Sequence, residues 1–120
     1  MMCSERGSMK LLFASILIAA ALPLAAAAET WTSAPLIDQK CSTKYTLKDA
    51  DTHTRGCALS CASSGFGILT SDGKFLKFDD AGSKKALAAL KGSKKSDHLR
   101  ATVTGEVASD TIMVQSIKLD

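Results

Sequence analysis

The sequence lacks the short motifs that mark several large enzyme classes. It has no glycine-rich phosphate loop, no dinucleotide fingerprint and no Ser-His-Asp arrangement. Its aspartates fall in expected turns and helix caps, so nothing pairs two carboxylates as a general acid and a general base. We therefore expect a protein that is not an enzyme.

Strong charge of one sign and aromatic side chains are also scarce. Aromatic residues make up 5% of the chain, and the formal net charge is +3 over 120 residues. Proteins that bind single-stranded nucleic acid combine a basic groove with stacked aromatics, so we do not expect a nucleic-acid partner. One basic run is interpreted as the solvated surface of a helix and its loop: Lys84, Lys85, Lys91, Lys94, Lys95 and Arg100.

The one long apolar run lies near the N-terminus. It follows Lys10, covers residues 11–24 and ends just before Ala26-Ala27-Ala28. A basic residue, an apolar run and an Ala-x-Ala site in this order are typical of a cleaved secretory signal peptide. We predict a signal over residues 1–28, with Met9 as a possible true start, and one periplasmic or secreted domain over residues 29–120. No membrane span is expected after cleavage, since no cationic stop follows the run.

Cleavage after Ala28 removes Cys3 and leaves Cys41, Cys57 and Cys61. An odd number of cysteines in an oxidising compartment predicts one disulfide with a spare thiol, or a site that uses all three. A domain of this size has a modest core and often benefits from a covalent or metal staple.

The remaining pattern predicts a mainly β domain with two short helices. A first strand is expected over 31–37, a cysteine-bearing helix within 49–63, and a hairpin over 67–78 around Asp72-Gly73. A second helix over 84–91 and a second hairpin over 99–117 follow. A helix between the third and fourth of five strands is the layout of an OB-like Greek-key barrel. The alternative is an open α+β sheet with one face covered by a helix.

Two cysteine motifs carry a resemblance to a known group of proteins. An Asp-x-x-Cys runs from Asp38 to Cys41, and a His-Thr-x-x-Cys-x-x-x-Cys runs from His53 to Cys61. With the segments 74–79, 99–107 and 110–114, the chain resembles small exported, largely uncharacterised bacterial proteins with OB-like domains. This resemblance implies a compartment and a fold, and it implies no established activity.

The spacing of the cysteines favours a disulfide from outside the first helix. Residues four apart on a regular helix have Cβ atoms about 5–6 Å apart, whereas a disulfide needs about 3.5–4.5 Å. Cys57 and Cys61 are therefore not expected to pair with each other. We predict a bridge from Cys41 to either Cys57 or Cys61, which stabilises the fold by roughly 3 kcal/mol in the chain-entropy model.

A metal site is the alternative interpretation of the same cluster. Cys41, His53, Cys57 and Cys61 form a Cys3His set suited to zinc or copper. One continuous helix would place the His53 and Cys61 backbones roughly 12 Å apart along its axis, so the site requires a helix that begins after His53. A thiol-redox role ranks third, because exchange sites normally use Cys-x-x-Cys.

These observations favour a non-enzymatic exported binding or structural module, stapled by one disulfide and without a cofactor. Trp31, Tyr45 and Phe75 are the candidates for a ligand surface. The expected partner is a small molecule, an envelope component or a protein. Zinc or copper is the expected cofactor only in the alternative, metal-binding interpretation.

Overall fold

The computed structural model describes residues 27–120, so the predicted signal peptide, Cys3 and Met9 fall outside the described range apart from residues 27 and 28. Within that range no helix is both long and apolar enough to cross a membrane. The elements in chain order are β1 (Glu29–Asp38), η1 (Gln39–Cys41), η2 (Ala50–Thr52), α2 (Arg55–Ser60), η3 (Ala62–Ser64), β2 (Phe66–Leu69), β3 (Phe75–Phe78), α3 (Asp80–Gly92), β4 (Arg100–Ala108) and β5 (Thr111–Leu119).

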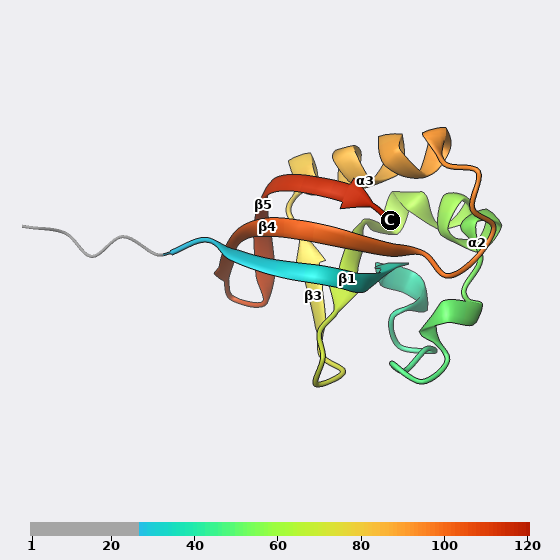
Figure 1. Ribbon diagram of the computed structural model, residues 1–120, viewed down its shortest axis with the longest axis horizontal. Helices are drawn as coiled ribbons and strands as arrows, with labels where there is room; N and C mark the ends of the chain where they lie inside the picture. The colour runs from blue at the N-terminus through green and yellow to red at the C-terminus, as the bar shows by residue number, and fades with distance from the viewer. Residues whose placement is uncertain (1–26) are drawn as a thin grey trace, which may run out of the picture.

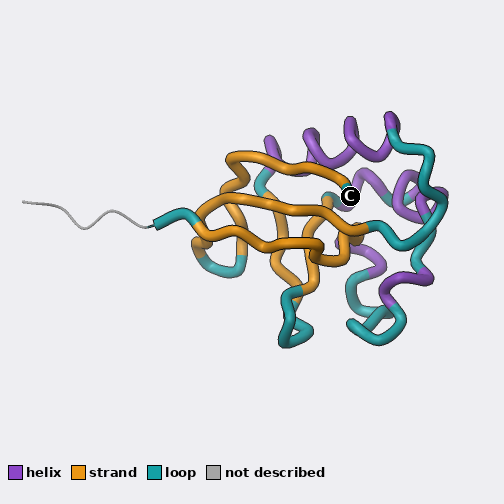
Figure 2. Tube along the Cα trace, in the orientation of Figure 1, coloured by secondary structure: helices purple, strands orange, loops and turns teal. Residues whose placement is uncertain are grey.

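Five strands close into a barrel in the order β1-β2-β3-β5-β4, with β4 returning to β1 (Figure 1). All neighbouring strands are antiparallel except β3 and β5, which are parallel. Figure 2 shows the helical segments along one side and at one end of these strands. The predicted OB-like five-stranded barrel is confirmed, and the open-sheet alternative is wrong because β4 pairs back with β1.

Strand β1 changes partner along its length. Residues 29–35 pair with β4, and residues 36–38 pair with β2. Pro35 lies at the changeover, where a residue without an N–H group is tolerated. A bulge between Trp31 and Ala34, with Ser33 at φ +48°, bends the strand toward its second partner. The C-terminal end of β1 is therefore paired with β2 and no longer with β4.

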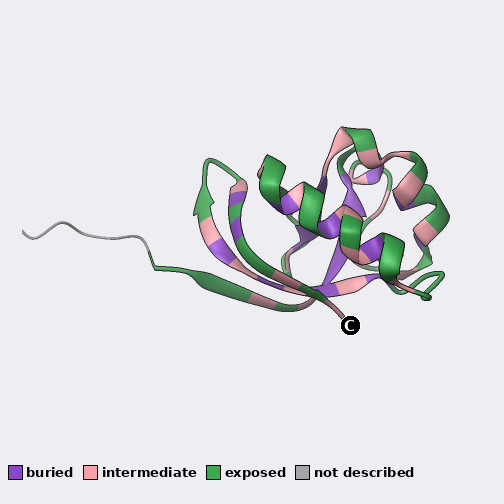
Figure 3. Cartoon of the chain, turned by 90° about the horizontal axis from the view of Figure 1, so that it is seen from above, coloured by how far each residue is buried: buried purple, intermediate pink, exposed green. Residues whose placement is uncertain are grey.

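Helix α3 covers the barrel with a narrow apolar face. Ala86 and Leu90 are fully buried, and Figure 3 shows the buried positions of α3 turned toward the strands. Asp79 caps the helix by accepting a hydrogen bond from the Gly82 N–H (2.9 Å). Because Asp79 supplies this cap, the helix begins at Asp80, four residues before the predicted start.

The cysteine-bearing segment differs from the prediction of one helix within 49–63. It forms three short pieces, η2, α2 and η3. Thr54 caps α2, since its hydroxyl accepts a hydrogen bond from the Cys57 N–H (3.1 Å). The helix thus begins after His53, as the metal interpretation requires.

Both predicted hairpins are confirmed. In the β2–β3 turn, Gly73 adopts φ +84°, and the Thr70 N–H donates to the Lys74 carbonyl (2.8 Å). Ser109 and Asp110 both have positive φ in the β4–β5 turn. Two successive positive φ values match the twist of the flanking strands.

Candidate metal centre

The site begins at the end of β1, which is buried on both faces. Leu36 belongs to the barrel core, while Ile37 belongs to a second apolar cluster with Cys41, Ala50 and Leu69. Residues 39–54 supply Cys41 and Ala50 to this second cluster, with Tyr45 and Leu47 packed against it. The next residue along the strand, Asp38, is consequently 0% exposed.

The Asp38 carboxylate is held by the turn that follows it. Its Oδ2 accepts a hydrogen bond from the Cys41 N–H (2.9 Å) and so caps η1. This bond fixes the carboxylate beside the Cys41 side chain. It also leaves Oδ1 directed toward His53.

His53 reaches the same place from the end of η2. The backbone N–H of His53 donates to the Ala50 carbonyl (3.1 Å), and the His53 side chain is 1% exposed. The Tyr45 ring packs edge-on against the imidazole, with ring centroids 5.1 Å apart at 75°. The Tyr45 ring therefore restricts the orientation of the His53 ring.

A bidentate ion pair fastens the segment that precedes His53. Arg100 donates from Nε to Asp51 Oδ1 and from Nη2 to Asp51 Oδ2, both at 3.0 Å. Arg100 also donates to the Ser33 carbonyl (2.9 Å), which ties the pair to the bulge in β1. The hydrogen bond from Arg100 lowers the pKa of Asp51. This ion pair positions the backbone two residues before His53.

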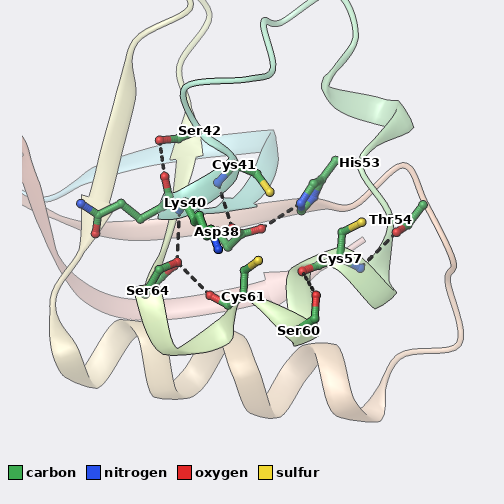
Figure 4. Close-up of polar contacts among 12 residues, drawn as sticks. Asp38, Lys40, Cys41, Ser42, His53, Thr54, Cys57, Ser60, Cys61 and Ser64 are labelled. Carbon is green, nitrogen blue, oxygen red and sulfur yellow. Dashed lines mark hydrogen bonds and ion pairs between the residues drawn. The ribbon is translucent and has the colours of Figure 1, made fainter.

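Asp38, Cys41 and His53 bring three potential metal ligands together. One donor atom from each lies within 4.8 Å of the other two, and all three residues are buried. Figure 4 shows the three side chains facing a common space. Carboxylate oxygen, thiolate sulfur and imidazole nitrogen are all established zinc ligands.

The contact between Asp38 and His53 is close but is not a hydrogen bond. His53 Nε2 lies 2.8 Å from Asp38 Oδ1, yet the two groups are not aligned for donation, and both atoms lack a hydrogen-bond partner. His53 Nδ1 is also buried without a partner. A neutral imidazole has one acceptor nitrogen, and neither His53 nitrogen nor Asp38 Oδ1 has a hydrogen-bond partner within residues 27–120; a cation beside them would satisfy both acceptors. The residues therefore fit a cation.

The Cys41 thiol is not activated as a nucleophile. Burial, followed by the hydrogen bond and charge of Asp38 and then by Cys61, raises its pKa from 9.0 to about 11. Reactive thiols in proteins instead have lowered pKa values. A bound metal would have to displace the Cys41 proton, as it does for any cysteine ligand. The Cys41 thiol is therefore a weak nucleophile toward reagents in solution.

Of the four residues predicted as metal ligands, the structure brings Cys41 and His53 together. Cys57 is exposed and Cys61 is half-buried, and both lie outside the 4.8 Å group; the Cys61 side chain is turned toward it (Figure 4). All three thiols are unbridged. The Cys41 disulfide and the complete Cys3His set stay predictions. Asp38 was missed as a ligand, and its signal was the Asp-x-x-Cys spacing at the end of an apolar strand.

The three residues predicted for a ligand surface lie in two places. Tyr45 and Phe75 pack against the second apolar cluster, which contains Cys41. Trp31 instead lines a pocket of about 380 Å³ together with Leu47 and Arg100. The structure therefore does not assemble these aromatics into one surface.

Comparison with family models, curated proteins and solved structures gives no match. The chain is a small five-stranded mixed β-barrel. Its resemblance to small exported bacterial proteins stays a prediction.

Proposed function

We propose that this domain is an exported zinc-binding module with Asp38, Cys41 and His53 as ligands. The observation that carries this proposal is the convergence of three buried donor groups, of which Asp38 Oδ1 and both His53 nitrogens lack a hydrogen-bond partner. Leaving a buried polar atom unsatisfied costs about 1–3 kcal/mol. A cation bound between these groups offsets that cost.

The mixed donor set favours zinc over copper. Zinc accepts carboxylate, thiolate and imidazole ligands in one site. Copper(I) prefers soft thiolate and thioether sulfur. Of the three donor atoms here, only that of Cys41 is sulfur; Asp38 offers an oxygen and His53 a nitrogen. Sites with three protein ligands keep a fourth position for water or another group. Zinc held here would polarise whatever molecule occupies that position.

Export is part of the same proposal. Strand β1 begins at Glu29, the residue directly after the proposed cleavage site. Cleavage after Ala28 would therefore leave every strand of the barrel in the mature chain. The mass of the protein recovered from the periplasm or the medium tests this point, and a retained segment 1–28 would contradict it.

Zinc titration of the reduced, metal-free protein tests the ligand assignment. We expect one zinc ion per chain, measured by competition with a chromophoric chelator. The two histidines of the chain provide a matched pair of variants. His53→Gln should weaken binding at least tenfold, whereas His98→Gln, with a side chain 65% exposed, should leave it unchanged. Equal effects of the two substitutions would exclude His53 as a ligand.

A second candidate function, recognition of a small molecule, an envelope component or a protein, is favoured by the pocket beside Trp31. Its volume of about 380 Å³ falls in the range of small-molecule sites. Trp31 is the only tryptophan of the chain, so its fluorescence reports on this pocket. Binding of the dye 1-anilinonaphthalene-8-sulfonate should quench that fluorescence, and Leu47→Ser should weaken the quenching. Quenching that is unchanged in this variant would place the dye elsewhere.

A further inference from the structure

Cys61 lies beside the metal centre because hydrogen bonds join its segment to η1. The Lys40 N–H donates to the Ser64 hydroxyl (3.1 Å), and that hydroxyl donates to the Cys61 carbonyl (2.8 Å). Lys40 is the residue next to Cys41. One serine thus connects the backbones that carry the two cysteines.

The two side chains also interact. Cys61 packs against the second apolar cluster, which contains Cys41. Its charge and its hydrogen bonding contribute, after burial and Asp38, to the raised pKa of Cys41. Cys57 is exposed and is not among the residues packed against that cluster. Cys61, and not Cys57, is therefore the neighbour of the buried thiol.

Exposure distinguishes the two thiols. Cys41 is 9% exposed, whereas Cys61 is half-buried at the end of α2. A reagent in solution consequently meets the Cys61 sulfur before it meets the Cys41 sulfur. Figure 4 shows both side chains next to the Asp38 carboxylate, with Cys41 above it and Cys61 below it in this view.

We propose that Cys41 and Cys61 form a redox switch that controls zinc binding, an inference that rests on the proposed function. The Cys41 sulfur can hold zinc or bond to the Cys61 sulfur, and it cannot do both. The reduced protein binds zinc through Asp38, Cys41 and His53. The oxidised protein loses the sulfur ligand and releases the ion.

The oxidant required is a small disulfide, RSSR. The deprotonated Cys61 sulfur attacks one sulfur of RSSR, forms a Cys61–SR bond and releases RS⁻. The Cys41 sulfur then attacks the Cys61 sulfur, forms the Cys41–Cys61 bond and releases a second RS⁻. The two thiol protons pass to the two thiolates. Two cysteine thiols are thus oxidised by two electrons, and RSSR is reduced to two RSH.

The test treats the purified protein with oxidised glutathione and then measures zinc affinity and disulfide pairing. We expect peptide mapping to find a Cys41–Cys61 bridge and the affinity to fall at least tenfold, with recovery after reduction. Zinc bound beforehand should slow the oxidation. Cys61→Ser should still bind zinc but lose the response to glutathione, whereas Cys57→Ser, the matched control, should keep both.

The possible outcomes distinguish failure of the zinc site from failure of the redox switch. A reduced protein that does not bind zinc overturns the proposed function and the switch together. Zinc affinity that survives complete oxidation overturns the switch alone. A bridge that joins Cys57 to either of the other cysteines also overturns it, because Cys61 would then not be the partner of the buried thiol.

Discussion

Replacing Asp38 by asparagine should change stability in opposite directions with and without zinc. The substitution keeps the shape of the side chain and still allows the amide oxygen to accept the Cys41 N–H that Asp38 Oδ2 accepts now. It places an N–H donor 2.8 Å from His53 Nε2, where the carboxylate offers only an acceptor. The Asp38→Asn substitution therefore removes one unpartnered oxygen, Asp38 Oδ1, and offers a donor to one unpartnered nitrogen, His53 Nε2.

The size of this effect follows from those two atoms. A buried unsatisfied polar atom costs about 1–3 kcal/mol, so the metal-free variant should be more stable than the native protein by about that amount. For a domain of this length, each kcal/mol raises Tm by roughly 4–8 °C. Zinc at 1,000 times its Kd stabilises the native protein by about 4.1 kcal/mol. The variant lacks the anionic ligand and should gain less than about 1 kcal/mol under the same conditions, so the order of the two Tm values reverses.

Circular dichroism melts in chelator and in excess zinc measure both halves of the prediction. Asp97→Asn is the control, because Asp97 is exposed and pairs only with His98; its Tm should respond to zinc as the native protein does. If Asp38→Asn melts below the native protein in chelator, the carboxylate is already satisfied and the reasoning fails. If zinc raises both Tm values equally, Asp38 is not a ligand.

Three further predictions concern the surroundings of the site. The Cys41 thiol ionises near pH 9.0 when unfolded and near 11 when folded, so metal-free stability should fall between pH 9 and 11 by up to about 1.4 kcal/mol per unit. Cys41→Ser should flatten that slope in urea unfolding. Asp51→Asn should lower the free energy of unfolding by about 0.5–1 kcal/mol at neutral pH, since its ion pair with Arg100 is one-third exposed. In acid the substitution should have no effect, because the ion pair of the native protein is lost as pH falls through the lowered pKa of Asp51. Leu90→Ala should cost about 2–5 kcal/mol of stability, because the Leu90 side chain of α3 is fully buried in the barrel core.

Outcomes that contradict these predictions are equally specific. An unchanged slope above pH 9 in Cys41→Ser would assign the loss of stability to other groups, such as Tyr45, whose pKa is also raised. A constant difference between Asp51→Asn and the native protein down to pH 2 would exclude the ion pair as its cause. Leu87→Ala, at a partly buried position, should cost less than Leu90→Ala, and the reverse order would place the wrong face of α3 on the barrel.

The barrel could be predicted because local signals agree with its topology. Asp72-Gly73 and Ser109-Asp110 mark hairpin turns. The alternation of apolar and polar residues over 99–107 has the period of a half-buried strand. The boundaries of the cysteine-bearing segment could not be predicted in the same way. Thr54 begins α2 late through its cap, and η1 and η3 are fixed by long-range hydrogen bonds, such as that from Lys40 to Ser64. The residues within 49–63 alone do not identify those distant partners, so the breaks between the short helices could not be predicted from them.

The candidate site was predicted only in part, for a reason that lies in β1. Cys41 and His53 were identified because sulfur and imidazole are recognisable ligands wherever they occur. Asp38 looks like an ordinary turn residue, and its burial depends on residues 39–54 covering the end of a strand that has left β4 for β2. A change of strand partner is a property of the closed barrel. The residues next to Asp38 in the sequence do not indicate this change of strand partner.

The position of the three groups also links the site to the stability of the fold. Asp38 is the last residue of β1, Cys41 ends η1, and His53 follows η2, so the proposed ligands bracket both ends of the segment 42–52. That segment contributes only Ala50 to the fully buried part of the second cluster, with Tyr45 and Leu47 packed at its margin. Few apolar contacts mean that local opening of this segment requires little free energy. A cation that joins Asp38, Cys41 and His53 would close the segment at both ends, and a Cys41–Cys61 bond would anchor only the first of them. Zinc and the disulfide would therefore not be equivalent staples, because zinc would join both ends of the segment and the disulfide only one.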